Sequence, residues 1–377
     1  MIRCLHLADL HLGWRADFLD DRAEQRTRER DTLLTRITSW ALQPENAIDL
    51  VLIVGDLFET HRPADILVET VIRDLGQLVQ AGKTVITVPG NHDEITYHDS
   101  VYRRHISRWP GILVQNPMPA HVQSFSICGE VLHFYSMAYT GGLTQVAGRL
   151  SCFPPLVGDG IHLAAFHGSL DWDNGERGLP IDGQALAMAG YDYVALGHFH
   201  RYQELGSTTS KWAYAGMIEG KGFADPGCSQ LTIVELGPRA ARIAPVAWPT
   251  RRSRIEQLDM VDVETADDLE QRITAMADSE LLLRVDLTGT ASFLVDAELL
   301  TVRLASRFFH LEISDSSLHL DDRLMEQWAG EPTVRGYFVR RLLSQYHSCA
   351  TDEEREIVQL ALRRGMAAFM ERGESGA

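Results

Sequence analysis

Short apolar segments alternate with longer polar segments of helical character along the first part of the chain. We expect strands at 2–7, 48–54 and 85–88, with helices at about 20–42 and 63–80 between them. Segment 48–54 is apolar except at one position, which is typical of a parallel strand buried on both faces. Strands that alternate with helices pair through right-handed crossovers, so this pattern predicts a mainly parallel sheet.

The middle of the chain has more strands and fewer helices. Segments 121–127 and 131–136 are typical of a hairpin, because a short polar turn separates them. We therefore expect one α/β domain over residues 1–250, whose second half is more antiparallel than its first. Further strands are expected at 161–166, 193–196, 212–215, 229–236 and 242–247.

A change of composition at 237–255 indicates a domain boundary. This stretch holds three prolines and five arginines but no acidic residue, and a solvated linker is the simplest interpretation of it. Strands and helices alternate again afterwards, which predicts a small α/β cap domain over 255–320. The remaining segment, 321–377, is expected to be helical.

Two apolar stripes predict amphipathic helices in this last segment. The first stripe recurs every four residues, and the second follows a capping box, Thr351-x-x-Glu354. The stripes consist of Val334, Phe338, Leu342 and Tyr346, and of Val358, Leu362, Met366 and Phe369.

The composition is that of a globular protein. Of the 377 residues, 45% are hydrophobic and 23% are charged, which excludes a disordered chain and allows a sizeable core. No apolar run reaches the roughly 18 residues that a membrane span needs. Five cysteines are scattered without a C-x-x-C pair, and no secretion signal follows Met1. We therefore expect reduced thiols, a cytoplasmic location and no membrane partner.

The chain is strongly acidic, with 35 basic and 52 acidic side chains and a formal net charge of −17. Such a chain is not a general nucleic-acid coat protein. It can still bind a phosphate polymer locally, where bound cations or a small basic strip offset the negative field. Clustered carboxylates would also suit cation binding.

Polar residues follow five of the predicted strands at the point where each strand ends. In an open α/β sheet the carboxyl ends of the strands converge on one crevice, so these residues would meet there. A spacing of two residues in extended chain directs both side chains to the same side. The five blocks are Asp9-x-His11, Gly55-Asp56, Gly90-Asn91-His92-Asp93, His167-Gly168 and Gly197-His198-x-His200.

These side chains offer carboxylate, amide and imidazole donors but no thiolate. Such mixed ligation suits manganese, iron or zinc, and seven donors suit two ions that share a bridging carboxylate. Taken singly, each residue is more often a turn residue, a helix cap or a structural histidine. The joint pattern favours a metal centre, and we interpret the ten remaining histidines as structural.

The ordered blocks D-x-H, G-D, G-N-H-D, H-G and G-H-x-H resemble the calcineurin-like metallophosphoesterase superfamily. The resemblance implies a β-sandwich flanked by helices, and hydrolysis by two metal ions. It also implies that His92 protonates the leaving oxygen and that Asp93 orients His92. The implied ligands are Asp9, His11, Asp56 and His200 for one ion, and Asp56, Asn91, His167 and His198 for the other, with Asp56 bridging.

Two further segments, 55–63 (GDLFETHRP) and 214–222 (YAGMIEGKG), are similar to those of the SbcD-type DNA repair exonucleases, in their short bacterial branch. This resemblance implies a manganese-dependent DNA exonuclease, with iron, zinc or magnesium as alternatives to manganese. The sequence departs from the pattern at Glu59, where some relatives have a histidine that contacts DNA, and at Met217, where many have a small polar residue.

The resemblance also implies partners: DNA, an SbcC-like coiled-coil ATPase, and a second copy of the chain in a homodimer. In that family the C-terminal helices dock on the coiled coil, whereas packing of the two stripes on each other or on the cap is the alternative. Arg251, Arg252 and Arg254 are candidates for DNA phosphate contacts, and a solvated linker is about as good an interpretation of them.

Two other functions are compatible with the same residues. A small-substrate phosphatase or cyclic-nucleotide phosphodiesterase would use the same chemistry, but it would need neither the cap nor the C-terminal helices. A non-catalytic assembly subunit would keep the fold as a scaffold. The intact set of seven donors and the retained His92 favour an enzyme over such a scaffold.

Overall fold

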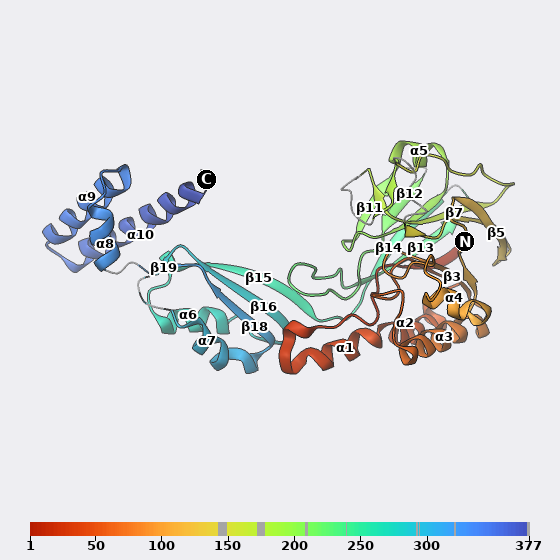
Figure 1. The fold of residues 1–377 in the computed structure, drawn as a ribbon, viewed down its shortest axis with the longest axis horizontal. Helices are drawn as coiled ribbons and strands as arrows, with labels where there is room; N and C mark the ends of the chain where they lie inside the picture. The colour runs from red at the N-terminus through yellow and green to blue at the C-terminus, as the bar shows by residue number, and fades with distance from the viewer. Residues whose placement is uncertain are drawn as a thin grey trace. The chain divides into compact units, whose positions relative to one another are not determined.

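The computed structural model describes residues 1–141, 149–171, 178–207, 210–238, 240–291, 293, 295–319 and 322–374. The chain forms two compact units, Met1–Thr250 and Arg251–Ala377 (Figure 1). The stretch 237–255 is not mainly a linker, because an edge strand and the start of another strand lie within it. The division of the second unit into a cap and a helical domain stays a prediction.

One mixed sheet of the first unit carries the predicted strands of the N-terminal part. Strands β1 (Ile2–Leu7), β2 (Leu50–Val54), β3 (Thr84–Val88) and β4 (Ile112–Leu113) are parallel, and β13 (Gln230–Gly237) pairs with β1 antiparallel. The sheet order is β14 (Ala240–Ala247), β13, β1, β2, β3 and β4.

A second six-stranded sheet contains the strands of the middle of the chain. Its four inner strands are parallel to one another, and only the two edge strands run antiparallel to their neighbours. The expected antiparallel character of the second half is therefore confined to the edges of this sheet and to β13 and β14 of the first sheet. The order is β11 (Gln203–Gly206), β12 (Lys211–Tyr214), β10 (Tyr193–Gly197), β7 (Ile161–His167), β6 (Glu130–Ser136) and β5 (Ala120–Ile127).

The two sheets pack face to face, and helices cover their outer faces, as the family resemblance predicts. One continuous core joins Leu5 and Val51 of the first sheet to Leu163 and Ala195 of the second. On the outer face of the second sheet, Leu186 packs in a separate cluster. The helices of this unit are α1 (Ala23–Asp31), α2 (Leu33–Ala41), α3 (Asp65–Gln80), α4 (Val101–His105) and α5 (Gly183–Met188), and β8 (Ser169–Leu170) pairs with β9 (Pro180–Ile181).

The second unit opens with a small three-stranded parallel sheet, as its alternating pattern predicts. Strand β16 lies between β15 and β18, and alternate residues Leu283, Val285 and Leu287 of β16 are fully buried. The elements are β15 (Arg252–Asp259), α6 (Ala266–Thr274), β16 (Asp278–Thr288), β17 (Thr290–Ala291), α7 (Ala297–Leu304), β18 (Phe308–Asp315) and β19 (Leu318–His319).

Three helices follow: α8 (Asp322–Ala329), α9 (Val334–Ser348) and α10 (Asp352–Glu374). The capping box exists, because Thr351 Oγ1 accepts from the Glu354 N–H while the Glu354 carboxylate accepts from the Thr351 N–H. The two predicted stripes contribute to one apolar cluster centred on Val339. Val334, which begins the first stripe, is instead 76% exposed. Among the described residues, no helix combines the length and apolarity that crossing a bilayer requires.

Candidate metal centre

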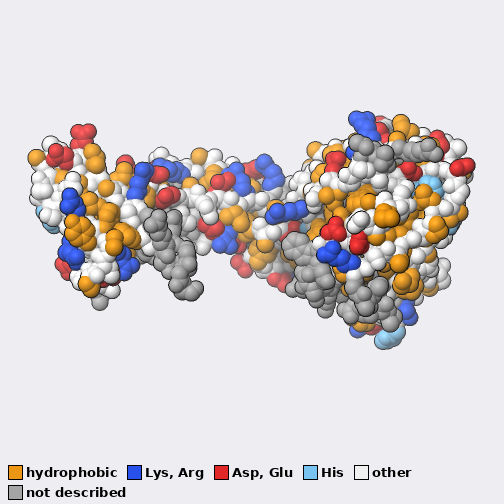
Figure 2. All heavy atoms as spheres, turned by 90° about the horizontal axis from the view of Figure 1, so that it is seen from above, with side chains coloured by type: hydrophobic (Ala, Val, Ile, Leu, Met, Phe, Trp, Pro, Cys, Tyr) orange, Lys and Arg blue, Asp and Glu red, His pale blue; other side chains and the backbone are white. Residues whose placement is uncertain are grey.

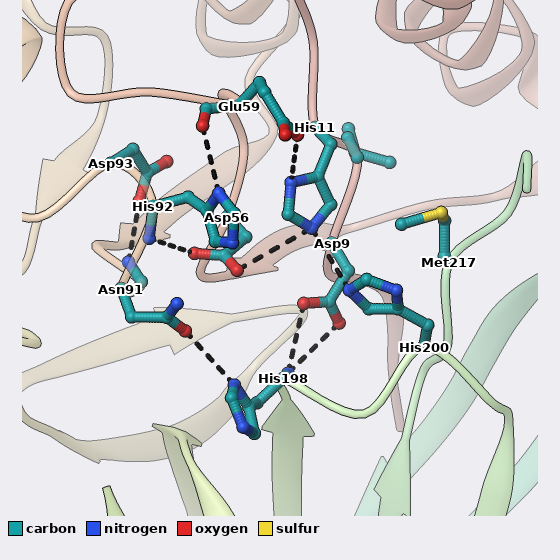
Figure 3. A network of polar contacts seen from close by, with 12 residues as sticks. Asp9, His11, Asp56, Glu59, Asn91, His92, Asp93, His198, His200 and Met217 are labelled. Atoms are coloured by element: carbon teal, nitrogen blue, oxygen red, sulfur yellow. Dashed lines mark hydrogen bonds and ion pairs between the residues drawn. The ribbon is translucent and has the colours of Figure 1, made fainter. Parts of the chain in front are cut away.

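The five polar blocks meet at one end of the sandwich, but they come from two sheets rather than one. Asp9, Asp56 and Asn91 follow strands of the first sheet. His167 ends β7 of the second sheet, and His198 directly follows β10 of the same sheet. Figure 3 shows the side chains from both sheets directed toward a common space. The convergence therefore takes place across the sandwich, where the carboxyl ends of β1, β2 and β3 face those of β7 and β10.

One side of this space is formed by Asp9, His11 and His200. Their ligand atoms all lie within 4.8 Å of one another. The Nε2 atoms of His11 and His200 are 3.2 Å apart, so the two imidazoles direct a ring nitrogen to nearly the same point. Asp9 and His11 are completely buried, while His200 is half-buried.

The other side is formed by Asn91, His167 and His198. Asn91 Oδ1 lies 2.9 Å from Nε2 of His167 and 3.1 Å from Nδ1 of His198. Asp56 lies between the two sides: its Oδ2 is 3.4 Å from Nε2 of His167 and 3.7 Å from Nε2 of His11. This position suits the bridging role that the resemblance implies for Asp56, which stays a prediction.

The backbone that carries these residues is unusual. Asp9, His11, Asp56 and His198 all have positive φ, at 54°, 47°, 51° and 106°. Residues other than glycine rarely adopt this conformation, because it is strained. Such strained backbone is found most often at functional sites. Gly90 is required by proximity, because a Cβ there would lie 2.2 Å from Oδ1 of Asp56.

His92 lies at the edge of the same space. Its backbone N–H donates to Oδ1 of Asp56 at 2.9 Å, and its ring meets that of His11 edge to face with centroids 4.7 Å apart. A ligand atom of His92 also lies within 4.8 Å of ligand atoms of His11 and Asp56. His92 is therefore close enough to reach a substrate atom bound at the centre.

These geometric features occur in a chain with a recognisable sequence profile. The profile of the calcineurin-like phosphoesterases matches residues 2–202, more than half of the chain. The chain belongs to this family. Membership places it among the metal-binding phosphoester hydrolases and accounts for the two-sheet fold.

Curated relatives of this phosphoesterase are distant. The SbcD subunit of the nuclease SbcCD of Bacillus subtilis is 25% identical over 278 residues, covering 63% of this chain and 67% of that protein. The DNA double-strand break repair protein Mre11 of Methanopyrus kandleri is 24% identical over 208 residues, covering 53% of this chain and 44% of its own. The uncharacterized metallophosphoesterase YhaO of Bacillus subtilis is 22% identical over 229 residues, covering 59% and 54%. The chain thus spans about half the length of the latter two.

Among solved structures, TT1561 of Thermus thermophilus aligns with 64% of this chain and 98% of its own. The identity is 11% and the TM-score is 0.38. The fold assignment therefore rests on the family profile together with the two packed sheets.

The electrostatics of the phosphoesterase centre favour neutral imidazoles at two of the predicted ligands. Burial lowers the pKa of His11 to about 4, and burial with the adjacent His167 lowers the pKa of His198 to about 4. Both rings are therefore uncharged near neutral pH and can offer a nitrogen lone pair, as metal ligation requires. Burial raises the pKa of the Asp9 carboxyl to about 6.

His167 and Asp56 shift each other in opposite directions. Burial alone would lower the pKa of His167, but the Asp56 carboxylate raises this pKa to about 9. Burial would likewise raise the pKa of Asp56, and His167 instead holds it well below its ordinary range. The pair shows that this end of the sandwich favours positive charge beside Asp56, whether a proton or a metal ion supplies it.

Asp93 does not have the contacts that we expected for it. Among the hydrogen bonds of the described residues, its carboxylate accepts from the Gly90 and Phe58 N–H groups and from the Tyr102 hydroxyl, the last at 2.7 Å. The orienting contact to His92 comes instead from the main-chain oxygen of Glu59, which lies 3.0 Å from His92 Nδ1. Asp93 therefore braces the loop that carries His92 rather than the His92 ring.

Three polar residues that the sequence did not single out as part of the centre lie beside it. Glu59 Oε2 lies 2.7 Å from His11 Nδ1, and Lys221 Nζ lies 2.6 Å from the same oxygen. Asp225 Oδ2 lies 2.5 Å from Nδ1 of His200. Glu59 was visible in the sequence only as a departure from the family pattern, and the loop of Lys221 and Asp225 carried no motif for this role.

The three arginines proposed for DNA contact lie in the second unit and are already paired with carboxylates. Arg251 pairs with Glu280 at 3.0 Å and stacks on the ring of Phe309. Figure 2 shows basic and acidic side chains interspersed on the visible face of this unit, without a field of one sign. Arg252 pairs with Asp278, and Arg254 pairs with Glu256.

Proposed function

We propose that the chain is a metal-dependent nuclease that hydrolyses phosphodiester bonds at DNA ends. The observation that most supports this proposal is the convergence of buried carboxylate, amide and imidazole donors from five strand ends, in a chain of this family. Asp56 would be shared by two ions. Asp9, His11 and His200 would complete the ligands of the first ion, and Asn91, His167 and His198 those of the second.

The residues suit divalent cations. His11 and His200 turn Nε2 toward Nε2 at 3.2 Å, an arrangement that a proton or a cation between them stabilises. Mixed oxygen and nitrogen donors favour Mn²⁺, with Fe²⁺, Zn²⁺ or Mg²⁺ as alternatives. When bound, two such ions would lower the pKa of a shared water and neutralise the charge of the phosphate.

His92 is the residue that we assign to the leaving oxygen. Its Nδ1 lies 3.0 Å from the Glu59 carbonyl oxygen, which can only accept, so Nδ1 keeps its hydrogen there. The proton that His92 transfers is therefore carried on Nε2. Because His92 is only half-buried, a substrate oxygen can approach that atom. Asp93 supports this role indirectly, through the Gly90 and Phe58 N–H groups that fix the loop.

DNA is the substrate that the relatives favour. Two of the three curated relatives described above are named as a nuclease subunit and as a DNA double-strand break repair protein. The −17 net charge requires the DNA contacts to be local, and the bound cations themselves would supply part of the attraction. Arg251, Arg252 and Arg254 are the candidates for contacts beyond the centre.

The proposal is tested by incubating the purified full chain with Mn²⁺ and three substrates. These are a linear duplex, the same DNA as a covalently closed circle, and a chromogenic phosphodiester. A nuclease acting on ends shortens the linear duplex and spares the circle. Cleavage of the small diester without any cleavage of DNA would support a small-substrate phosphodiesterase instead. Binding of two metal ions without hydrolysis of any substrate would support a non-catalytic scaffold.

We further propose that an SbcC-like ATPase is the partner of this nuclease, as the SbcCD name of one relative suggests. Most of the apolar stripe residues are used to pack α9 and α10 together. Val334, Tyr337 and Ile357 remain at least 60% exposed on these helices and are candidates for the docking face. Addition of the partner to the DNA assay tests whether it is required for cleavage.

A further inference from the structure

Each of the two imidazoles that face each other has a carboxylate behind it. Nε2 of His11 and Nε2 of His200 point inward, 3.2 Å apart. On the outward nitrogens, Glu59 Oε2 lies 2.7 Å from Nδ1 of His11, and Asp225 Oδ2 lies 2.5 Å from Nδ1 of His200. Figure 3 shows the Glu59 side chain directed to His11 from outside the ring of predicted ligands.

A carboxylate at one ring nitrogen fixes the protonation of the other. It keeps the imidazole hydrogen on Nδ1 and thereby leaves the Nε2 lone pair free, and it also fixes the plane of the ring. Asp225 does this for His200 through a hydrogen bond. Glu59 Oε2 lies at ion-pair distance from Nδ1 of His11 but out of line for a hydrogen bond, so Glu59 favours the same tautomer of His11 through its negative charge. No other described carboxylate oxygen lies within hydrogen-bonding distance of Nδ1 in either ring.

Lys221 holds the first of these carboxylates. Its ammonium lies 2.6 Å from Oε2 of Glu59, the oxygen that also contacts His11. The chain has only three lysines, and the side chain of this one is 18% exposed beside the predicted centre. A carboxylate this close to a cation site can swing inward and become a ligand itself. The Lys221 ion pair opposes that movement and keeps Glu59 behind His11.

The loop that carries Lys221 and Asp225 is anchored to the same part of the fold. The buried guanidinium of Arg30 donates to the carbonyl oxygens of Glu219 and Gly220, just before Lys221. It also donates to the carbonyl oxygen of Leu10, the residue between Asp9 and His11. One arginine thus ties the loop to the segment that carries two of the predicted ligands.

We propose that Glu59, Asp225 and Lys221 are positioning residues that make the His11–His200 side of the centre a preorganised cation site. The inference rests on the proposed function, because it assumes that this side binds a divalent ion. It assigns these residues an effect on one ion only. Among the described residues, no hydrogen bond or ion pair joins any of the three to Asn91, His167 or His198, which would hold the other ion.

The test is a titration of Mn²⁺ into the full chain after removal of metal by chelation, with free Mn²⁺ measured by electron paramagnetic resonance. We expect the unaltered chain to bind two ions. Glu59→Gln, Asp225→Asn and Lys221→Met should each weaken one ion by roughly 10- to 100-fold and leave the other unchanged. Lys221→Arg should restore most of the affinity. Hydrolysis of a chromogenic diester by Lys221→Met should recover as Mn²⁺ is raised.

Lys83→Met is the matched control, because Lys83 precedes β3 at the end of the strand opposite the centre. Thermal unfolding of each metal-free variant reports whether it still folds. Unchanged binding of both ions by Glu59→Gln and Lys221→Met overturns the proposal. Equal weakening of both ions, without rescue by Lys221→Arg, also overturns it in favour of a structural role. If the unaltered chain binds no Mn²⁺, the proposed function itself fails, which is a distinguishable result.

Discussion

At the residue scale, the charge of Asp56 can be removed without a change in the backbone. Asp56 has a φ of 51°, a conformation that Asn also tolerates well. Asp56→Asn therefore keeps the backbone and removes only the negative charge between the two sides. We expect it to lose both Mn²⁺ ions and to reduce diester hydrolysis more than roughly 100-fold. Loss of a residue that only supports a metal ligand already lowers activity by up to about that factor.

Mn²⁺ stoichiometry measured by mass spectrometry after gel filtration checks this expectation. Asp65→Asn is the control, since its carboxylate lies 77% exposed at the start of α3. Retention of two ions by Asp56→Asn would contradict the bridging role.

His92→Ala should separate chemistry from metal binding. We expect both Mn²⁺ ions to remain and the rate of DNA hydrolysis, which expels an alkoxide, to fall by roughly 10²- to 10⁴-fold, the usual contribution of a general acid. His98→Ala is the matched control, because its side chain is 94% exposed. A substrate with a leaving group that needs no proton should be hydrolysed by His92→Ala at nearly the original rate. Loss of one metal ion in His92→Ala would instead identify His92 as a ligand.

The sequence predicted which polar side chains would meet wherever a possible metal donor directly follows an apolar strand. Each predicted ligand comes at or shortly after an apolar strand, so the strand pattern predicts its place. Glu59, Lys221 and Asp225 could not be placed in this way, because they lie in irregular loops whose paths depend on long-range contacts. The Arg30 guanidinium, which fixes one of those paths, is 20 residues from Leu10 and 190 from Gly220 along the chain.

At the element scale, the turn after β3 packs closely on the turn after β2. The backbone of Gly90, after β3, lies directly against Asp56, after β2. A Cβ on Gly90 would lie 2.2 Å from Oδ1 and 2.3 Å from the backbone nitrogen of Asp56. Gly90→Ala should therefore displace the turn after β2, weaken Mn²⁺ binding, and lower the free energy of unfolding by about 1–3 kcal/mol, the usual cost of overpacking.

Gly76→Ala provides the control for this prediction. Gly76 lies within α3, and apart from its neighbours and the backbone of its own helix no atom lies within 4 Å of the Cβ position. Because glycine weakens a helix interior, this change should raise the free energy of unfolding by roughly 0.5–1 kcal/mol and leave metal binding unaltered. Urea denaturation of the three proteins measures both effects. Equal stability of Gly90→Ala and the unaltered chain would show that the turn can relax.

The helix stripes show where periodicity becomes inaccurate. A spacing of exact fours drifts around an α-helix by roughly 40° at each step, since successive residues are about 100° apart. Over the predicted stripe this drift moves Val334 away from the face centred on Val339, and Val334 is accordingly exposed. The existence of both helices followed from the sequence, whereas the buried face depended on which residues of α8 and α10 lie opposite.

At the scale of the whole molecule, the assignment of strands to sheets could not be read from the sequence. The strands of the centre have a similar apolar character: β2, β7 and β10 are buried at every residue, and β1 and β3 at all but one. The pattern therefore predicted parallel strands and polar ends, but a single sheet. The family resemblance, rather than the periodicity, indicated two packed sheets. Both arrangements place the carboxyl ends together, which is why the convergence of these side chains could be predicted although the topology could not.

The net charge of −17 makes the contribution of individual arginines to DNA binding measurable through salt. Arg252 and Arg254 are 67% and 46% exposed, and exposed ion pairs contribute little, so a DNA phosphate can replace their carboxylate partners. If both contact DNA, the variant with Arg252→Gln and Arg254→Gln should reduce the slope of log affinity against log salt by about 0.9 for each arginine.

Arg28→Gln, which alters an exposed arginine paired within α1, is the control. Fluorescence anisotropy with a labelled duplex between 50 and 200 mM salt, on the order of the range where such slopes are measured, gives both values. An unchanged slope would favour the interpretation of these arginines as a solvated surface and would leave the DNA contacts to the metal centre.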